Sequence, residues 1–331
     1  MAGREFDIIS NYFRPLAHGS GEALGLLDDA AVLSVPEGCE LVVTTDAVVG
    51  GVHYLETLPP QDIAHKVVGV NLSDLAAMGA TPHAVFLAAQ FSPDVSEDWL
   101  EGFAAGLGEA LKPSGAKLLG GDTVTTFGSQ AFTITALGHV EQGKALTRGG
   151  AQEGDLVLGT GTFGDAALGL ALWQGKIMGV LDGHEKHLTR RYARPEPRNV
   201  FGAKLSSLGL ATACVDVSDG LVQDLGHICG ASGVSAVLEW DQINVSDAAL
   251  SILDAEPQRQ REILSGGDDY ELVFTALPEH LGAIEDLAER LSLDVCVMGR
   301  IEAASVSHPR VQVLDDHGNR VDVGAGGYRH F

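Results

Sequence analysis

Apolar positions recur along this chain at two spacings, and each spacing predicts a kind of element. Between residues 61 and 78 apolar side chains recur at helical intervals, and Gly79 is placed to end that helix. Ser96 is placed to cap the next one, over 96–111. The same criteria predict further helices and strands. The helices are 4–14, 165–174, 220–231, 246–253 and 279–291; the strands are 30–35, 40–45, 83–91, 116–120, 132–137, 155–159, 212–217, 234–239, 270–276 and 293–299.

The mixed order of strands and helices in both halves predicts two domains of the α+β or α/β class. A length of 331 residues is enough for two domains of ordinary size. A Gly-rich polar stretch at 147–154 lies between the two patterns. We therefore expect an N-terminal domain over residues 1–148 and a C-terminal α/β domain over residues 149–331.

Composition narrows the function classes. Hydrophobic residues make up 45% of the chain and charged residues 20%, as in globular proteins, and the formal net charge is −24. Nucleic-acid and membrane-surface binding need basic patches, so neither is expected. No apolar run approaches the ~20 residues that span a bilayer, and the N-terminus lacks a signal-peptide pattern. The four cysteines form no CxxC pair, so free thiols and a cytoplasmic location are expected.

Six short segments place aspartate beside small residues, several of them where a strand should end. They are 27–30, 44–46, 71–74, 120–122, 216–219 and 267–271. If their carboxylates converged they would repel one another, by about 4 kcal/mol for two charges 4 Å apart at an effective dielectric near 20. A hard divalent cation, above all Mg²⁺, removes that penalty and commonly accompanies phosphates. The segments together therefore predict a polydentate magnesium site.

Each segment taken alone has an ordinary explanation. An aspartate after a strand is usually a turn residue, and Asp219 by itself could be a helix cap. Strand alternation is expected to place Asp216 and Ser218 on one face, which a capping role for Asp219 does not explain. Residues 266–271 could be a solvated acidic loop; its three acids are expected to have no compensating Lys or Arg, which is costly unless they are solvated or bind a cation. A lone His53 is more often structural than functional. The joint occurrence of all six segments is what favours a site.

A competing nucleotide signal lies at 159–164, which reads Gly-x-Gly-x-x-Gly after a predicted strand and before a predicted helix. Asp182 follows about 20 residues later, as in dinucleotide-binding folds, but it lies in a predicted turn. A tight strand-to-helix turn is therefore favoured. A P-loop is absent, so ATP would have to be held by metals and loop amides. An NAD-dependent oxidoreductase and a non-catalytic cation-binding protein remain alternatives.

In order along the chain, the acidic segments resemble the thiamine-monophosphate kinase family, within the superfamily of aminoimidazole ribonucleotide synthetase and selenophosphate synthetase. The resemblance rests on residues 28–31, 44–46, 71–79, 120–123, 145–148, 216–221, 266–271 and 327–328. Cys39 does not resemble the reactive cysteine of a selenophosphate synthetase; other ATP-using members of the superfamily remain alternatives.

The resemblance implies a two-domain aminoimidazole-ribonucleotide-synthetase-like fold and a homodimer paired through its N-terminal domains. It implies that residues 1–148 bind ATP and Mg²⁺ and that residues 149–331 complete the substrate site. The implied reaction is direct in-line phosphoryl transfer from ATP to thiamine monophosphate with several Mg²⁺ ions. The positions that match metal ligands are Asp29, Thr44, Thr45, Asp46, Asp74, Asp122, Asp216 and Asp219. Those that match ATP contacts are Gly121, Asp122, Arg148 and Ser218; those that match substrate contacts are His53, Asp268 and Tyr328. Asp46, Asp122, Asp219 and Arg148 are expected to be catalytic.

Two departures from the family pattern stand beside this match. Asp268 occupies a position where the family commonly has Glu, so its carboxylate is one methylene shorter. Leu27 stands where the family tends to have Gly, which predicts a stiffer loop before Asp28 and Asp29. Neither change removes a charge from the predicted site.

Overall fold

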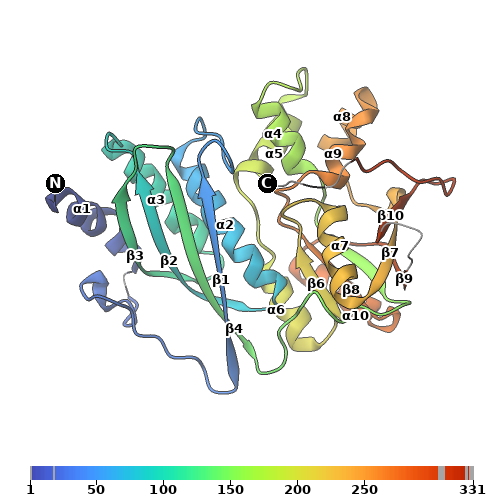
Figure 1. Cartoon of the computed structure of the whole chain (residues 1–331), viewed down its shortest axis with the longest axis horizontal. Coiled ribbons are helices and arrows are strands. Elements are labelled where there is room, and N and C mark those ends of the chain that lie inside the picture. The colour runs from blue at the N-terminus through green and yellow to red at the C-terminus, as the bar shows by residue number, and fades with distance from the viewer. Residues whose placement is uncertain (1, 18, 305–309, 325–326, 328–331) are drawn as a thin grey trace. The chain divides into compact units, whose positions relative to one another are not determined.

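Two β-sheets, one in each half of the chain, organise the protein. A computed structural model describes residues 2–17, 19–304, 310–324 and 327. It divides into one unit of residues 1–75 and 80–143 and a second of residues 76–79 and 144–331. Each unit combines one sheet with helices (Figure 1), so the predicted mixed two-domain architecture is confirmed.

The sheet of the first unit has four strands in the order β1-β4-β2-β3. Its strands are β1 (Cys39–Val49), β2 (Thr81–Phe91), β3 (Lys117–Thr125) and β4 (Ala131–Glu141). β4 is antiparallel to both neighbours, whereas β2 and β3 are parallel, with a register irregularity beside Val85 and Phe86. Helices α2 (Pro60–Ala77) and α3 (Glu97–Leu111) lie behind this sheet in Figure 1.

The two faces of this sheet have different surroundings. Alternate residues of β4 are buried, among them Phe132 and Ile134, while Thr133 and Thr135 face outward, as the alternation predicts. Phe132 belongs to an aromatic cluster with Phe91 and Phe103 on the buried side. The outward side is covered near β3 by the N-terminal segment, which comprises α1 (Ala2–Ile8) and short turns at Ile9–Phe13, Arg14–Ala17 and Leu24–Leu26.

Local signals locate several helix ends correctly. Gly79 adopts a left-handed φ of +68° just after α2, as a helix-ending glycine does. The Ser96 hydroxyl accepts the Trp99 N–H at 3.2 Å and caps α3. The predicted strand at 30–35 is wrong: residues 31–36 are irregular. Ala31 and Leu33 pack against a small core cluster, but the segment pairs with none of the described strands.

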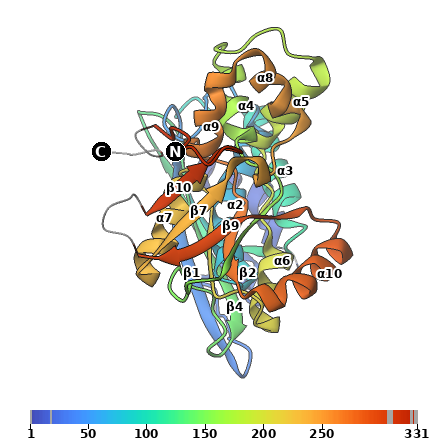
Figure 2. The ribbon, with the colours of Figure 1, turned by 90° about the vertical axis from the view of Figure 1, so that its right-hand side faces the viewer.

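The sheet of the second unit has six strands in the order β10-β7-β9-β5-β8-β6. Its strands are β5 (Leu156–Thr160), β6 (Ala213–Asp216), β7 (Val234–Glu239), β8 (Leu272–Ala276), β9 (Val295–Ala303) and β10 (Val311–Leu314). Only β10 and β7 are parallel among these pairs of described strands. The helices are α4 (Asp165–Trp173), α5 (Asp182–Ala193), α6 (Asn199–Leu208), α7 (Leu221–Ser232), α8 (Asp247–Ala255), α9 (Gln260–Ser265) and α10 (Leu281–Leu291); α4, α5, α8 and α9 group together (Figure 2).

Four elements of this unit escape the sequence patterns, namely α5, α6, α9 and β10. α5 is strongly polar and buries little more than Leu188, Arg191 and Tyr192, so its apolar periodicity is faint. Asp182 therefore begins a helix and does not lie in a turn. Among the described residues, no helix has both the length and the apolarity needed to cross a lipid bilayer.

A buried carboxylate joins α4 to α5 and α8. Asp165, at the start of α4, is fully buried and accepts hydrogen bonds from Thr162 Oγ1 (2.6 Å), Ser246 Oγ (2.5 Å) and His187 Nε2 (2.9 Å). Burial opposes its ionisation, but these bonds outweigh burial and hold its pKa below the usual value. The bond to Asp165 in turn raises the pKa of His187.

This pair predicts a pH-dependent stability. Because the pKa of His187 is raised on folding, its contribution is complete below the unfolded value of about 6.5 and is lost as pH rises through the folded value. The melting temperature should therefore fall between pH 6 and pH 9 by more in the wild type than in His187→Gln. Thermal unfolding by circular dichroism measures it, with His184→Gln on the same helix as the control. Equal slopes in wild type and His187→Gln would contradict this assignment.

Candidate active site

In the first unit, β1 and α2 bring two predicted acids together. The Thr44 hydroxyl donates to Asp74 Oδ2 at 2.5 Å, and the Asp46 N–H donates to the Oδ1 of buried Asn71 at 3.0 Å. Asn71 is itself fixed to the Val67 carbonyl. The alternate β1 residues Thr44 and Asp46 therefore face α2, which carries Asp74.

Asp46 and Asp74 are close enough to share a proton. Burial, the charge of Asp74 and a hydrogen bond to it raise the pKa of Asp46 to about 6. Two carboxylates in contact are stable only when a proton or a cation lies between them. With the Thr44 hydroxyl they make a hard oxygen donor set, which fits Mg²⁺.

Thr45 points away from this pair. Its hydroxyl donates to the Ile134 carbonyl at 3.1 Å and lies 3.2 Å from the Thr135 hydroxyl, on the outward side of the sheet. His53 closes the turn after β1. Its ring Nδ1 accepts the Val49 N–H at 3.0 Å, and its backbone N–H donates to the Val49 carbonyl at 2.8 Å. Both side chains thus have structural contacts here.

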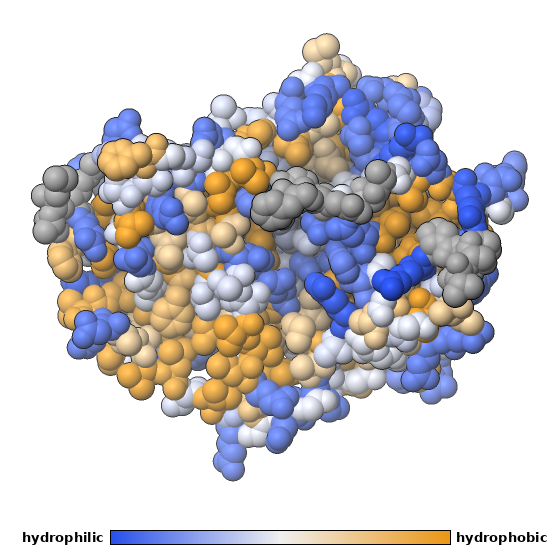
Figure 3. All heavy atoms as spheres, viewed as in Figure 1, coloured by the Kyte–Doolittle hydropathy of each residue, from blue (hydrophilic) through white to orange (hydrophobic). Residues whose placement is uncertain are grey.

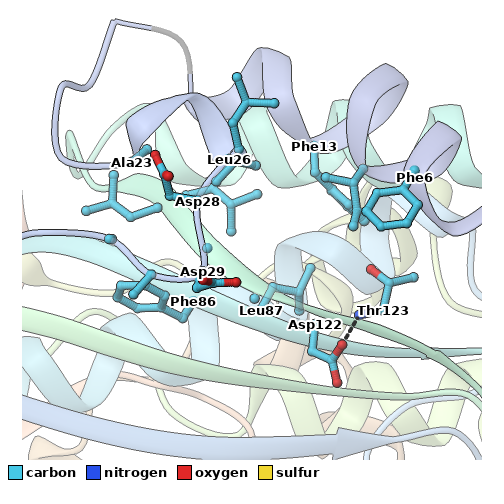
Figure 4. Close-up of a pocket in the computed structure, with 18 residues that line it drawn as sticks. Phe6, Phe13, Ala23, Leu26, Asp28, Asp29, Phe86, Leu87, Asp122 and Thr123 are labelled. Atoms are coloured by element: carbon cyan, nitrogen blue, oxygen red, sulfur yellow. Dashed lines mark hydrogen bonds between the residues drawn. The ribbon is translucent and has the colours of Figure 1, made fainter.

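A pocket of about 610 Å³ in the first unit contains a second group of predicted residues. Asp28, Asp29, Gly121 and Asp122 line it together with apolar side chains (Figure 4). The apolar lining includes Phe6, Phe13, Leu26, Leu27, Phe86 and Leu87. Its volume is in the range of small-molecule and cofactor sites, and the mixture of apolar walls with a few acids is typical of them.

The strand β3 requires a glycine at this pocket. Gly121 has a φ of +155°, and a Cβ there would lie 1.9 Å from the Leu87 carbonyl oxygen. Asp122 follows at once, and its Oδ1 accepts the Thr123 N–H at 2.9 Å, as Figure 4 shows. The glycine therefore lets β3 pair closely with β2 while Asp122 reaches the pocket.

Sheet register separates the two groups of acids. Asp122 pairs with Ala88 and through it with Thr133 on the outward side, whereas Asp46 pairs with Ile134 on the buried side. They also lie on the two outer strands of the sheet. Within the described parts of the chain, no three His, Cys, Asp or Glu side chains are grouped closely enough to hold a metal ion.

In the second unit, one buried acid organises the loop after β6. Asp224 Oδ2 accepts the N–H groups of Ser218 (3.1 Å), Asp219 (2.9 Å) and Gly220 (3.0 Å). Burial raises the pKa of Asp224 to about 7, although these N–H groups favour its charged form. The sequence analysis missed this residue; an aspartate in the first turn of a helix that follows an acidic loop was the available signal.

The expected arrangement of residues 216–219 needs correction. β6 ends at Asp216, which is buried, so Ser218 lies beyond the strand and does not share a strand face with it. The residue before α7 is Gly220, with a φ of +135° and no side-chain cap. Asp219 does not cap the helix; its Oδ2 accepts the Gln223 amide at 2.9 Å.

The acidic segment 266–271 lies beside this loop. The Asp268 N–H donates to the Ser218 carbonyl at 2.9 Å, and the Tyr270 N–H donates to the Val217 carbonyl at 2.8 Å. A Cβ on Gly267 would lie 2.1 Å from the Ser218 oxygen, so only glycine permits this approach. Asp268 is half-buried with a φ of +74°, and its Oδ1 accepts the Tyr270 hydroxyl at 3.1 Å.

The other two acids of this segment are structural, and the expectation that nothing compensates them is wrong. Glu271 is fully buried; it accepts two hydrogen bonds from Arg198, at 2.7 and 2.5 Å, and one from Arg191 at 2.8 Å. Asp269 accepts the Gly164 and Ala166 N–H groups at 2.7 and 3.1 Å. The arginines are distant in sequence, which concealed the pairing.

This ion-pair network also explains the Gly-x-Gly-x-x-Gly turn. A Cβ on Gly161, whose φ is +58°, would lie 2.2 Å from Glu271 Oε1, and one on Gly164 would lie 2.6 Å from Ile263. β5 is antiparallel to both β8 and β9, whereas a dinucleotide fold places this turn in a parallel unit. The glycines make room for buried neighbours, and the oxidoreductase alternative loses its support.

Arg148 is not brought to these loops, and Tyr328 cannot be placed. Arg148 is exposed, and its carbonyl accepts the Ser232 hydroxyl at 3.2 Å, at the end of α7 opposite to the 216–220 loop. A 12-residue helix is about 18 Å long, so the backbone of Arg148 is distant from Asp219. Tyr328 lies outside the described residues, although a Cβ on the preceding Gly327 would come within 2.2 Å of the Asp219 carbonyl.

Comparison with known proteins finds relatives that cover about nine-tenths of the chain. Residues 27–140 match the N-terminal domain of AIR synthase related proteins, and residues 152–312 match their C-terminal domain. The thiamine-monophosphate kinase of Haemophilus influenzae is 41% identical over 303 residues, covering 91% of this chain and 90% of the relative. That of Escherichia coli K12 is 41% identical over 305 residues, covering 92% of each.

Solved structures give the same result. The thiamine-monophosphate kinase of Stenotrophomonas maltophilia K279a superposes with a TM-score of 0.84 at 39% identity, covering 92% of this chain and 95% of that one. The structure of AaThiL complexed with AMPPCP and TMP gives 0.77 at 27% identity, covering 90% and 89%. Two matched domains and relatives above 40% identity over nine-tenths of the chain establish its membership: the chain belongs to the thiamine-monophosphate kinase family of AIR synthase related proteins.

Proposed function

We propose that this protein transfers the γ-phosphoryl group of ATP directly to thiamine monophosphate, forming thiamine diphosphate and ADP. The observation that carries the proposal is the full-length similarity to thiamine-monophosphate kinases. A related structure was solved with AMPPCP, an ATP analogue, and TMP bound. The acidic groups of both units are consistent with such chemistry, because both reactants are anionic.

For the nucleotide, the pocket beside β3 is our candidate. Its apolar walls, including Phe86, suit a purine base, and its acids Asp29 and Asp122 suit magnesium bound to phosphates. Gly121 and Asp122 are proposed nucleotide contacts there, and Ser218 and Arg148 are proposed contacts by family resemblance. Bound magnesium would supply charge screening between the two anions.

The chain's own residues then have mainly positioning roles. We propose Asp29, Thr44, Thr45, Asp46, Asp74, Asp122, Asp216 and Asp219 as metal ligands, and Asp46, Asp122, Asp219 and Arg148 as catalytic. The proximity of Asp46 to Asp74, and the burial of Asp216, support the oxygen donor set. The acceptor phosphate is largely ionised at neutral pH, since its second pKa is about 6, so no general base is required. His53, Asp268 and Tyr328 are proposed substrate contacts.

A homodimer paired through the first unit is part of the proposal. Leu41 and Val43 on β1 are large apolar side chains with 49% and 54% of their surface exposed, on the outward side of the sheet. Figure 3 shows apolar residues gathered over this region of the first unit. A second copy would bury them. The buried thiols Cys214 and Cys229 suit the reducing cytoplasm in which we place the reaction.

An assay with ATP, Mg²⁺ and a panel of acceptors tests the proposal. We expect ADP and thiamine diphosphate in equal amounts from thiamine monophosphate, no product from free thiamine, and no turnover after chelation of magnesium. Free thiamine is the matched control because it lacks only the acceptor phosphate. Turnover restricted to another acceptor would replace this assignment with another ATP-using member of the superfamily. Cation binding without turnover would indicate a non-catalytic protein.

A further inference from the structure

A single oxygen of Asp224 receives three consecutive backbone N–H groups. These come from Ser218, Asp219 and Gly220, at 2.9–3.1 Å. Asp224 is buried in the first turn of α7, and its neighbour Gln223 donates to Asp219 Oδ2. Because one oxygen accepts all three bonds, a single side chain fixes the path of the loop.

Successive N–H groups in such a turn usually form a concavity that binds an anion, such as a phosphate. Here the carboxylate of Asp224 already fills that concavity. The loop can therefore offer a ligand its side chains, the Asp219 carboxylate and the Ser218 hydroxyl, but not its amides. The oxygens of these two side chains can coordinate a cation.

We propose that Asp224 is a positioning residue that holds the 218–220 loop so that Asp219 and Ser218 face a divalent cation, and that the loop does not contact phosphate through its amides. The inference rests on the proposed function for the identity of the reaction. Asp224 itself touches neither cation nor substrate. It acts through Asp219, as outer residues of metal sites commonly orient the ligands.

Two variants and a matched control test the proposal. Asp224→Ala removes the acceptor, and Asp224→Asn retains an oxygen for the three N–H groups. Asp155→Asn is the control because Asp155 is equally buried in the same unit. It accepts the Gln152 N–H and the Thr212 hydroxyl at the far end of β6. All three variants should melt cooperatively, which circular dichroism checks first.

Direct metal binding is the first readout. Mn²⁺ binding followed by electron paramagnetic resonance should weaken about 10–100-fold in Asp224→Ala, and the Mg²⁺ concentration for half-maximal turnover should rise similarly. Asp224→Asn should recover most of the affinity, and Asp155→Asn should equal the wild type. Hydrogen exchange of the Ser218–Gly220 amides should quicken about tenfold in Asp224→Ala alone.

Unchanged Mn²⁺ affinity in a folded Asp224→Ala protein would overturn the proposal. Equal losses of Mn²⁺ affinity in Asp224→Ala and Asp155→Asn would also overturn it, since they would show that replacing any buried aspartate of this unit weakens metal binding. Failure of the proposed function is a separate outcome: the wild type would show no transfer to thiamine monophosphate. Metal binding and amide exchange would still test Asp224 in that case.

Discussion

Asp46→Asn is expected to lower kcat by about 10²–10³-fold, the usual cost of removing one preorganised electrostatic group. It should leave the protein at least as stable as the wild type. Asp46 lies against Asp74, and its burial together with the neighbouring charge and hydrogen bond of Asp74 raises the pKa of Asp46 to about 6. The neutral amide removes the repulsion from Asp74 while the backbone N–H keeps its bond to Asn71. A loss of activity combined with a gain of stability is typical of a functional site.

Steady-state kinetics and thermal melting without magnesium measure both effects. Asp94→Asn is a suitable control, since Asp94 is an exposed carboxylate of the same unit. Asp122→Asn should show a comparable loss of activity. Near-normal turnover in both Asp46→Asn and Asp122→Asn would remove these acids from the mechanism. Lower stability in Asp46→Asn would show that Asp46 has a structural role.

Glu271→Gln is expected to have the largest effect on stability. Glu271 is fully buried and accepts hydrogen bonds from Arg198 and Arg191, so the change removes the buried counter-charge of two poorly solvated guanidinium groups. Only the partly exposed Glu196, 3.7–4.0 Å from them, would still oppose their charge among the ion pairs of the described residues. Breaking a buried ion pair from one side costs about 3–5 kcal/mol. A typical domain is stable by only 5–15 kcal/mol, so most of the margin could be lost.

Urea denaturation measures this loss as a change in midpoint and in the free energy of unfolding. Glu196→Gln is the matched control. Glu196 contacts Arg190 at 3.0 Å in the same network but is partly exposed, so its loss should cost about 0–1 kcal/mol. A Glu271→Gln protein as stable as Glu196→Gln would show that water reaches the arginines. The buried ion pairs would then not be what stabilises residues 266–271.

Elements with strong local signals were predictable from sequence. α3 has an N-cap serine and apolar periodicity, and β7 occupies residues 234–239 as predicted. α5 was not predictable, because its stability comes from tertiary contacts of Leu188 and Arg191 and not from an apolar stripe. Residues 30–35 have strand-like composition but pair with none of the described strands, so tertiary context decided against the local pattern.

The candidate site was predictable as a set of residues but not as a geometry. Each acidic motif could be identified because glycine or another small residue accompanies it. That Asp46 and Asp122 lie on opposite faces depends on the register of β2 and β4, which no local pattern encodes. The pairing of Glu271 with Arg198, 73 residues earlier, was equally invisible. Asp224 resembled an ordinary helix-start residue until its three bonds were seen.

The backbone ladder between Val217–Ser218 and Asp268–Glu271 has a practical consequence for protein engineering. The Val217 N–H donates to the Glu271 carbonyl, and the Tyr270 and Asp268 N–H groups donate back to residues 217 and 218. Neither of these two backbone segments can change its path without breaking hydrogen bonds to the other. A chimaera that exchanges phosphate-acceptor specificity between relatives should therefore take both segments, 217–218 and 268–271, from the same parent. Chimaeras that take the two segments from different parents should refold poorly.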